Sequence, residues 1–114
     1  MKFLSIYKTA ETGVPPTQQE METMGKLIEE GMKAGYLLAV EGCLPSANGA
    51  RIRLSTGEIT ITDGPFTESK EVIVSFALIE VRSKDEALEL ARRFWKVVGD
   101  GEGDIRQVFG PGDE

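Results

Sequence analysis

The amino-acid sequence predicts an α+β fold, and three observations support this prediction. Residues 17–34 and 83–98 carry apolar side chains at helical spacing. The other apolar segments are short and rich in β-branched residues, which is typical of strands. The elements follow the order β-α-β, hairpin, β-α-β, and two β-α-β units with right-handed crossovers form a ferredoxin-like sheet with both helices on one face. We expect residues 1–114 to form one domain, because this is the usual length of one.

The first β-α-β unit is expected in the first half of the chain. Residues 2–8 form a short apolar run that predicts a strand. A Thr-x-x-Glu capping box begins the first helix at Thr17, and Gly35 is a natural stop for it. Residues 36–44 are apolar with little interruption apart from Glu41, so they predict the second strand.

The second half is expected to supply a hairpin and the second unit. Residues 51–62 alternate apolar and polar side chains around a turn, which predicts a hairpin with one apolar face. Residues 72–81 form a long apolar run, typical of a central strand covered on both faces. A second capping box starts at Ser83. A glycine-rich acidic turn at 100–104 then precedes the last strand at 105–109.

Composition argues against several classes of function. The formal net charge is -6 and the basic residues are scattered, so nucleic-acid binding is not expected. No run approaches the roughly 18 apolar residues that span a membrane. The single cysteine, Cys43, is expected to be a small buried hydrophobe, and a cytoplasmic location is expected because nothing requires an oxidising compartment. Histidine is absent and there is one cysteine, so no transition metal is expected. No cofactor is expected either.

One segment carries a recognisable motif. Residues 63–71 read Asp-Gly-Pro-Phe-Thr-Glu-Ser-Lys-Glu and resemble the DGPF-x-E-x-K-E signature of the YCII-related family. Weaker similarities follow in family order at 41–42, 50–53, 83–87 and 105–109. The resemblance implies a dimeric α/β barrel, a homodimer of ferredoxin-like protomers, with a pocket near the DGPF segment. It also implies genes placed beside, or fused to, those of extracytoplasmic-function sigma factors, but no single activity.

The chain departs from the family where chemistry would occur. Some relatives are thought to use a His–Asp pair, which a chain without histidine cannot assemble. Relatives often carry Leu-His-Pro where this chain has Cys43-Leu44-Pro45, and an aromatic residue where it has Ala77. We therefore do not expect the dechlorinating lyase activity of one family type. The small side chain of Ala77 should enlarge or reshape any cavity that lies there.

The DGPF segment has two interpretations. As a plain turn, Asp63 would accept a backbone hydrogen bond and Gly64 would take a positive φ. As a functional segment, Asp63 would face a cleft and act there as a catalytic residue. The candidate ligand-binding residues are Gly64, Pro65, Phe66, Lys70, Glu71 and Arg106.

Glu41 is the second candidate catalytic residue, because it interrupts an apolar strand. An ionised carboxylate there is costly without a partner. Glu41 is either an edge-strand residue that faces water or a buried acid with a raised pKa. Arg106 of the last strand is a candidate partner for Glu41, or a group that binds an anionic ligand.

Three functions stay open on this basis. The first is a module that binds a small molecule or peptide, with an accessory role in sigma-factor regulation. The second is a cofactor-free lyase or isomerase that uses Glu41 or Asp63 as its base. The third is a structural homodimer that presents the hairpin to a partner protein. A deep pocket lined by Asp63, Glu41 and Arg106 would favour the first two, whereas a solid core with an exposed apolar hairpin would favour the third.

Overall fold

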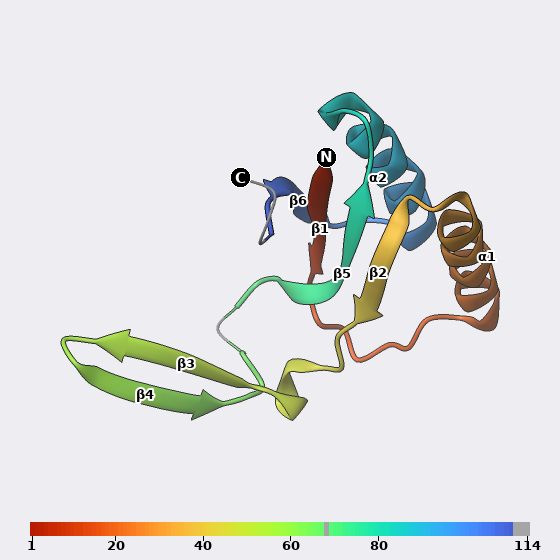
Figure 1. The fold of residues 1–114 in the computed structure, drawn as a ribbon. Helices are drawn as coiled ribbons and strands as arrows, with labels where there is room; N and C mark the ends of the chain where they lie inside the picture. Colours follow the sequence, from red (N-terminus) through yellow and green to blue (C-terminus); the bar gives the residue numbers. More distant parts are fainter. Residues whose placement is uncertain (68, 111–114) are drawn as a thin grey trace.

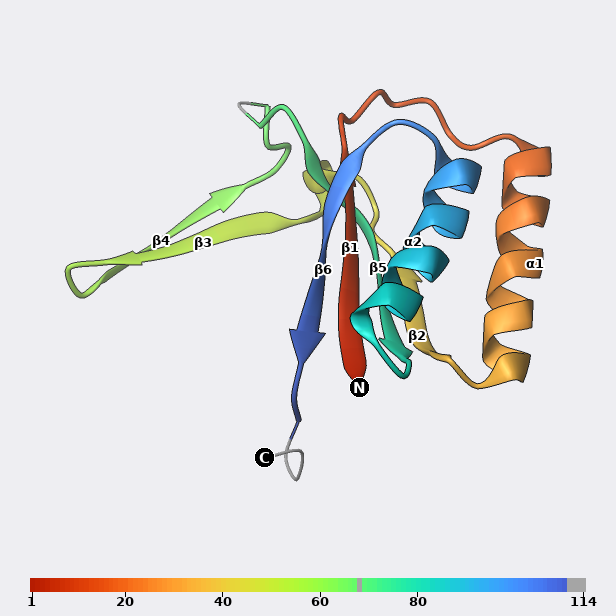
Figure 2. The same cartoon turned by 90° about the horizontal axis from the view of Figure 1, so that it is seen from above.

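The computed structural model describes residues 1–67 and 69–110. Its main sheet has four antiparallel strands in the order β2-β5-β1-β6, and both helices lie on one face of it (Figure 1, Figure 2). The strands of this sheet are β1 (Lys2–Thr9), β2 (Leu37–Gly42), β5 (Val72–Glu80) and β6 (Glu102–Val108). The other elements are α1 (Gln18–Ala34), the short 3₁₀ turn η1 (Ser46–Asn48), β3 (Ala50–Ser55), β4 (Glu58–Asp63) and α2 (Lys84–Val98). The α+β ferredoxin-like prediction is confirmed, with the hairpin inserted between the two β-α-β units.

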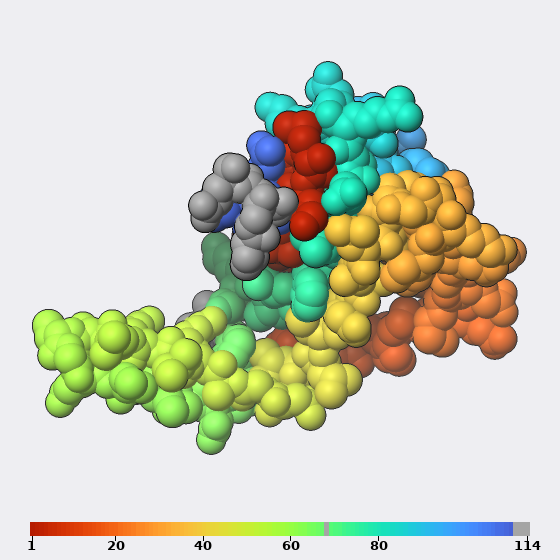
Figure 3. All heavy atoms as spheres, viewed as in Figure 1, coloured from red at the N-terminus to blue at the C-terminus, as the bar shows by residue number. Residues whose placement is uncertain are grey.

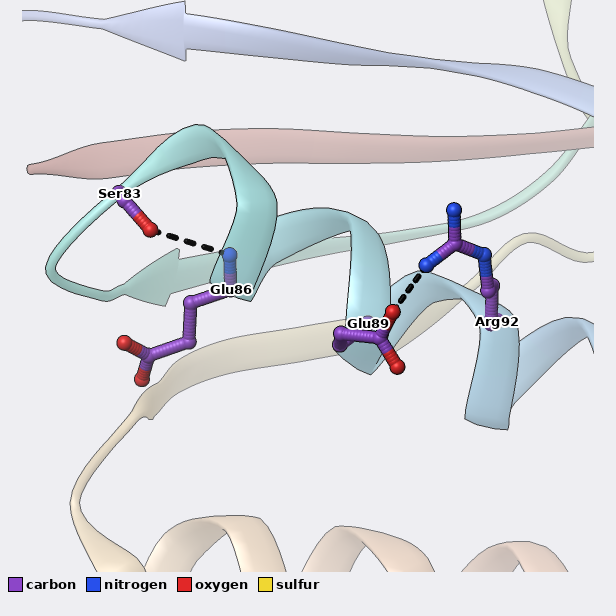
Figure 4. A network of polar contacts seen from close by, with 4 residues as sticks. All are labelled: Ser83, Glu86, Glu89 and Arg92. Carbon is purple, nitrogen blue, oxygen red and sulfur yellow. Dashed lines mark hydrogen bonds and ion pairs between the residues drawn. The ribbon is translucent and has the colours of Figure 1, made fainter.

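Local sequence signals set where the helices begin. The Oγ of Ser83 accepts a hydrogen bond from the N–H of Glu86 at 3.2 Å and so caps α2 (Figure 4). One turn further along, the side chains of Glu89 and Arg92 pair on the exposed surface of the helix (Figure 4). Thr17 caps α1 in the same way as Ser83 caps α2. Within the described residues, no helix is long and apolar enough to cross a membrane.

The core between the sheet and the helices is small. Its buried cluster consists of Phe3, Ile79, Val81 and Ala87. The chain exposes 8527 Å², whereas a compact monomer of this mass exposes about 6,200 Å². Its radius of gyration is 16.0 Å, against about 13 Å for a compact domain of this length. The chain therefore carries much more surface than a compact monomer, and two regions contribute to this excess.

The first region is the face of the main sheet that carries no helix, which we call the open face. Residues directly opposite each other in paired strands lie on the same face, and they alternate with the core residues of the other face. The open face is formed by Glu41 of β2, Phe76 and Leu78 of β5, Leu4 and Ile6 of β1, and Asp104 and Arg106 of β6. Phe76 remains 38% exposed. Within the chain the central strand β5 is thus covered on one face only, which corrects the sequence prediction.

The second region is the hairpin, residues 50–63, which we call the arm. It projects away from the body on the side of the sheet opposite to the helices (Figure 1, Figure 2). In the space-filling view most of its length stands clear of the remaining chain (Figure 3). Ile52, Leu54, Ile59 and Ile61 are between 63% and 68% exposed. The predicted apolar face of the hairpin therefore lies in solvent.

Two further expectations were wrong. The last strand begins at Glu102 rather than at 105, because Gly103 pairs with Tyr7 at a close approach of the two backbones. A Cβ at Gly103 would lie 1.7 Å from the carbonyl oxygen of Ile6. The glycine that indicated a turn is instead what lets this strand pair. Cys43 is exposed rather than buried.

Candidate functional site

The DGPF segment lies at the end of the sheet where β1 and β2 finish and β5 begins (Figure 1). A residue from each of the three adjoining loops meets there. The Oγ of Ser46 donates to Glu11 Oε2 at 2.6 Å, and the Ser46 N–H donates to Glu11 Oε1 at 2.5 Å. The same Oγ accepts from the N–H of Phe66 at 2.9 Å. We call Glu11, Ser46 and Phe66 the clamp, because they tie the three loops together.

The clamp replaces the turn contacts expected from the motif. The N–H of Phe66 is taken by Ser46 rather than by the carboxylate of Asp63. Gly64 has no positive φ, contrary to expectation. Glycine is needed there because a Cβ would lie 1.7 Å from the carbonyl oxygen of Ser46. The peptide bond between Gly64 and Pro65 is cis.

The base of the arm is attached to the same segment. The guanidinium of Arg51, in β3, lies 4.4 Å from the centre of the Phe66 ring. Its Nη2 also donates to the Oγ of Ser69 at 3.2 Å. A cation over an aromatic face and a hydrogen bond together fix one direction for the arm as it leaves the body.

The expected catalytic and ligand-binding residues are mostly exposed. Asp63, Lys70 and Glu71 reach solvent at the DGPF end, and within the described residues the carboxylate of Asp63 has no hydrogen-bond or ionic partner. Pro65 is exposed as well, whereas Gly64 and Phe66 are partly buried.

Glu41 and Arg106 do not meet within one chain. Both side chains are exposed and lie on the open face. They occupy the two opposite edge strands, with β5 and β1 between them. Three strand spacings of about 4.8 Å separate these edges by about 14 Å. The expected pairing of Glu41 with Arg106 is therefore absent from the chain.

An apolar cleft lies elsewhere, between the two helices and the sheet. It encloses about 70 Å³. Its walls include Leu27 and Ile28 of α1 and Leu90 and Phe94 of α2, and Ala77 contributes to the sheet side. A cavity at Ala77 agrees with the expectation drawn from its small side chain. The cleft is lined by none of Asp63, Glu41 and Arg106.

Two serines are among the residues that line this cleft. Ser5 of β1 lies opposite Ala77, and Ser75 of β5 lies opposite Tyr7. The two serines are therefore diagonal neighbours on adjacent strands, about 7–8 Å apart. In the described part of the chain neither hydroxyl has a hydrogen-bond partner. Sequence reasoning missed both. The available signal was a small polar residue at a core-facing position of an otherwise apolar strand.

The fold and the cleft define a ferredoxin-like α+β protein with an apolar cleft, and comparison identifies its family. The YCII-related domain matches residues 1–109, so the chain belongs to the YCII-related family. It is also similar to an uncharacterised protein of Rhizobium meliloti (strain 1021), with 37% identity over 75 residues. The matched region covers 66% of this chain and 60% of that relative. The resemblance seen in the DGPF motif is thus confirmed for the family.

The clamp should make stability depend on pH. The hydrogen bonds from Ser46, the side-chain one first and the backbone one second, lower the pKa of the Glu11 carboxyl below its ordinary value. A group with a lowered folded-state pKa stabilises the fold above its unfolded pKa, about 4.3 for glutamate, and this contribution is lost as pH falls through the folded value. Glu11→Gln should therefore have a lower melting temperature than wild type at pH 7, and the difference between the two melting temperatures should be smaller at pH 3.

Melting curves of both proteins at pH 7, 5 and 3 check this prediction. Glu22→Gln is the control, because Glu22 is exposed on α1 and, among the residues that the structure describes, its side chain accepts a hydrogen bond only from Gln18. A gap between wild type and Glu11→Gln that stays constant over this range would contradict it.

Proposed function

We propose that the protein binds a small, mainly apolar molecule in the cleft between its helices and its sheet. The observation that carries the proposal is the pair of unpartnered hydroxyls, Ser5 and Ser75, beside apolar walls. Ligand sites are typically apolar hollows with a few polar groups that orient the ligand. A ligand with an apolar body and one polar group that forms hydrogen bonds suits this lining.

The volume of the cleft either limits the size of the ligand or requires one wall of the cleft to move when a ligand binds. At about 70 Å³, it is about half of a 150 Å³ cavity that binds benzene. Either helix could form the movable wall, because each has one buried residue, Gly31 in α1 and Ala87 in α2. A surface ion pair links the two helices, in which Arg93 Nη2 lies 2.8 Å from both carboxylate oxygens of Glu30. Exposed pairs of this kind contribute about 1 kcal/mol or less, so this pair by itself adds little to the cost of moving a helix.

Filling the cleft should abolish binding. The probes are phenol and benzyl alcohol, each of which has an aromatic ring and one hydroxyl. At ten times its Kd, such a ligand should raise the Tm of wild type by about 5 °C. Ala77→Phe places a ring in the cleft and should remove this shift. Ala34→Phe is the matched control, since Ala34 ends α1 outside the cleft, and should retain it.

Thermal melts over a ligand concentration series measure the effect. Equal shifts in wild type and Ala77→Phe would show that the probes bind elsewhere. The absence of any shift in wild type would contradict the proposal for this class of ligand.

A cofactor-free lyase or isomerase is the second candidate. The supporting observation is the carboxylate of Asp63, which lies beside the clamp without a partner in the described chain. Glu41 is the other candidate base. Both carboxylates are exposed in the protomer, whereas bases tuned by burial are shielded from water. Binding in the cleft is therefore the better-supported function, and the accessory role beside a sigma factor rests on the family resemblance alone.

We further propose that the protein is a cytoplasmic homodimer that buries its open face. The surface above that of a compact monomer amounts to roughly 2,300 Å² per protomer. A standard interface covers about 800 Å² per partner, so the excess suffices for a stable dimer. Two apolar sheet faces pack about 10 Å apart, which would also cover Phe76 and Leu78.

The same dimer would bring Glu41 of one protomer and Arg106 of the other to the same side of the interface. They lie on opposite edges of the open face. A twofold axis that runs along the strands places the β2 edge of one sheet over the β6 edge of the other. In the register of the sheet Glu41 is level with Asp104, and Arg106 lies two residues further along β6, about 7 Å away. Glu41 would therefore face Arg106 of the second protomer if the two sheets are offset by this distance along the strands.

A further inference from the structure

The arm carries an apolar surface that its own chain does not cover. In the β3–β4 register Ile52 lies opposite Ile61, and Leu54 lies opposite Ile59, so all four side chains share one face. Each is at least 63% exposed. A two-stranded hairpin alone is at best marginally stable in water. The arm therefore needs a surface against which this face can pack.

The body of the same protomer does not supply that surface. The arm stands clear of it in the space-filling view (Figure 3). The contacts that attach it lie at its base, where Arg51 meets Phe66 and the N–H of Gly64 donates to Gly49 at 2.9 Å. These contacts set the direction of the arm without covering its aliphatic side chains.

The direction of the arm indicates what covers it. In both ribbon views it projects on the side of the sheet opposite to the helices, which is the side of the open face (Figure 1, Figure 2). The open face and the arm thus border one space. A molecule that packs on the sheet in this space also lies alongside the arm.

We propose that the arm of each protomer packs its aliphatic face against a second copy of this chain. This inference rests on the proposed homodimer and adds the arm to its interface. A twofold-related copy brings its own open face and its own arm, so both open faces and the aliphatic faces of both arms are covered. A partner without an arm would cover the open face and the arm of one chain only.

The length of the arm fits this role. Each of its strands has six residues, which span about 20 Å at a rise of about 3.4 Å per residue. Packed sheets lie about 10 Å apart. The arm is therefore long enough to pass the facing sheet and contact the flank of the second protomer.

Neighbouring residues of the arm provide a matched pair of variants. Ile59→Arg places a charge on the aliphatic face. Thr60→Arg places the same charge one residue away on the opposite face, where Thr60 pairs with Arg53. We expect Ile59→Arg to weaken dimerisation about tenfold or more, as for loss of an apolar anchor. Thr60→Arg should change it by less than about twofold, as for an exposed position.

Sedimentation over a concentration series measures the dimer Kd of each protein, and circular dichroism checks that each is folded. Leu54→Arg, opposite Ile59, is a second variant on the aliphatic face and should behave like Ile59→Arg. A monomeric wild type overturns the homodimer and this inference with it. A dimeric wild type whose Kd is unchanged in both aliphatic-face variants overturns the role of the arm and leaves the homodimer standing.

Discussion

Ser46→Ala should lower the free energy of unfolding by about 1–3 kcal/mol, the cost of leaving a hydrogen-bonding group without its partner. The Oγ of Ser46 accepts from the N–H of Phe66 and donates to Glu11, and the residue is only 8% exposed. Alanine fits the same space but cannot replace either bond. The DGPF segment would then be attached to the loop after β2 mainly by the hydrogen bond from the N–H of Gly64 to Gly49 and by the close approach of Gly64 to Ser46.

Asp63→Asn is the informative comparison, because it changes the first residue of the motif itself. The carboxylate of Asp63 is exposed and has no partner in the part of the chain that the structure describes. Its replacement should therefore change stability by no more than about 0.5 kcal/mol. If Asp63 is a catalytic base, the same variant loses activity while it remains as stable as wild type.

Urea denaturation of wild type and the two variants measures these differences. A Ser46→Ala variant as stable as wild type would show that the clamp does not hold the loops together. A strongly destabilised Asp63→Asn variant would return the motif to the interpretation in which Asp63 stabilises the turn.

Phe76→Asp should convert the protein from a dimer to a monomer. Phe76 is the largest apolar side chain of the open face and remains 38% exposed in the protomer. An aromatic anchor at the centre of an interface contributes about 2 kcal/mol or more. Its loss, together with a charge introduced between two sheets, should raise the dimer Kd about 30-fold or more.

Light scattering at micromolar concentration measures the mass of wild type and variant. Val14→Asp is the control, since Val14 is 77% exposed in the loop before α1 and away from the open face. Wild type and control should have the mass of a dimer. A wild type with the mass of one chain, 12.5 kDa, would contradict the dimer, and an unchanged mass for Phe76→Asp would place the interface elsewhere.

The sequence was most informative where a contact is local. Capping residues such as Thr17 and Ser83 hydrogen-bond to a backbone three residues ahead, so their pattern is visible along the chain. The alternation in residues 51–62 predicted the hairpin and its apolar face for the same reason. The DGPF motif identified the family and the region in which the clamp lies.

The candidate site was predicted less well, because its contacts join residues far apart in sequence. Glu11 and Ser46 are 35 positions apart, and neither carried a signal of its own. Ser5 and Ser75 became visible as a pair only through the register of β1 with β5. The separation of Glu41 from Arg106 likewise followed from the strand order, which places two strands between them.

The sequence by itself thus determined the family, the order of the elements, both helices and the amphipathic hairpin. The tertiary structure decided which apolar surfaces stay uncovered, because alternation along a strand shows that it has two faces but not what packs on each. It placed both helices over one face of the sheet and directed the arm toward the other. The open face and the arm are apolar by sequence, but they border one common space only because the base of the arm is fixed by Arg51, Phe66 and Ser69.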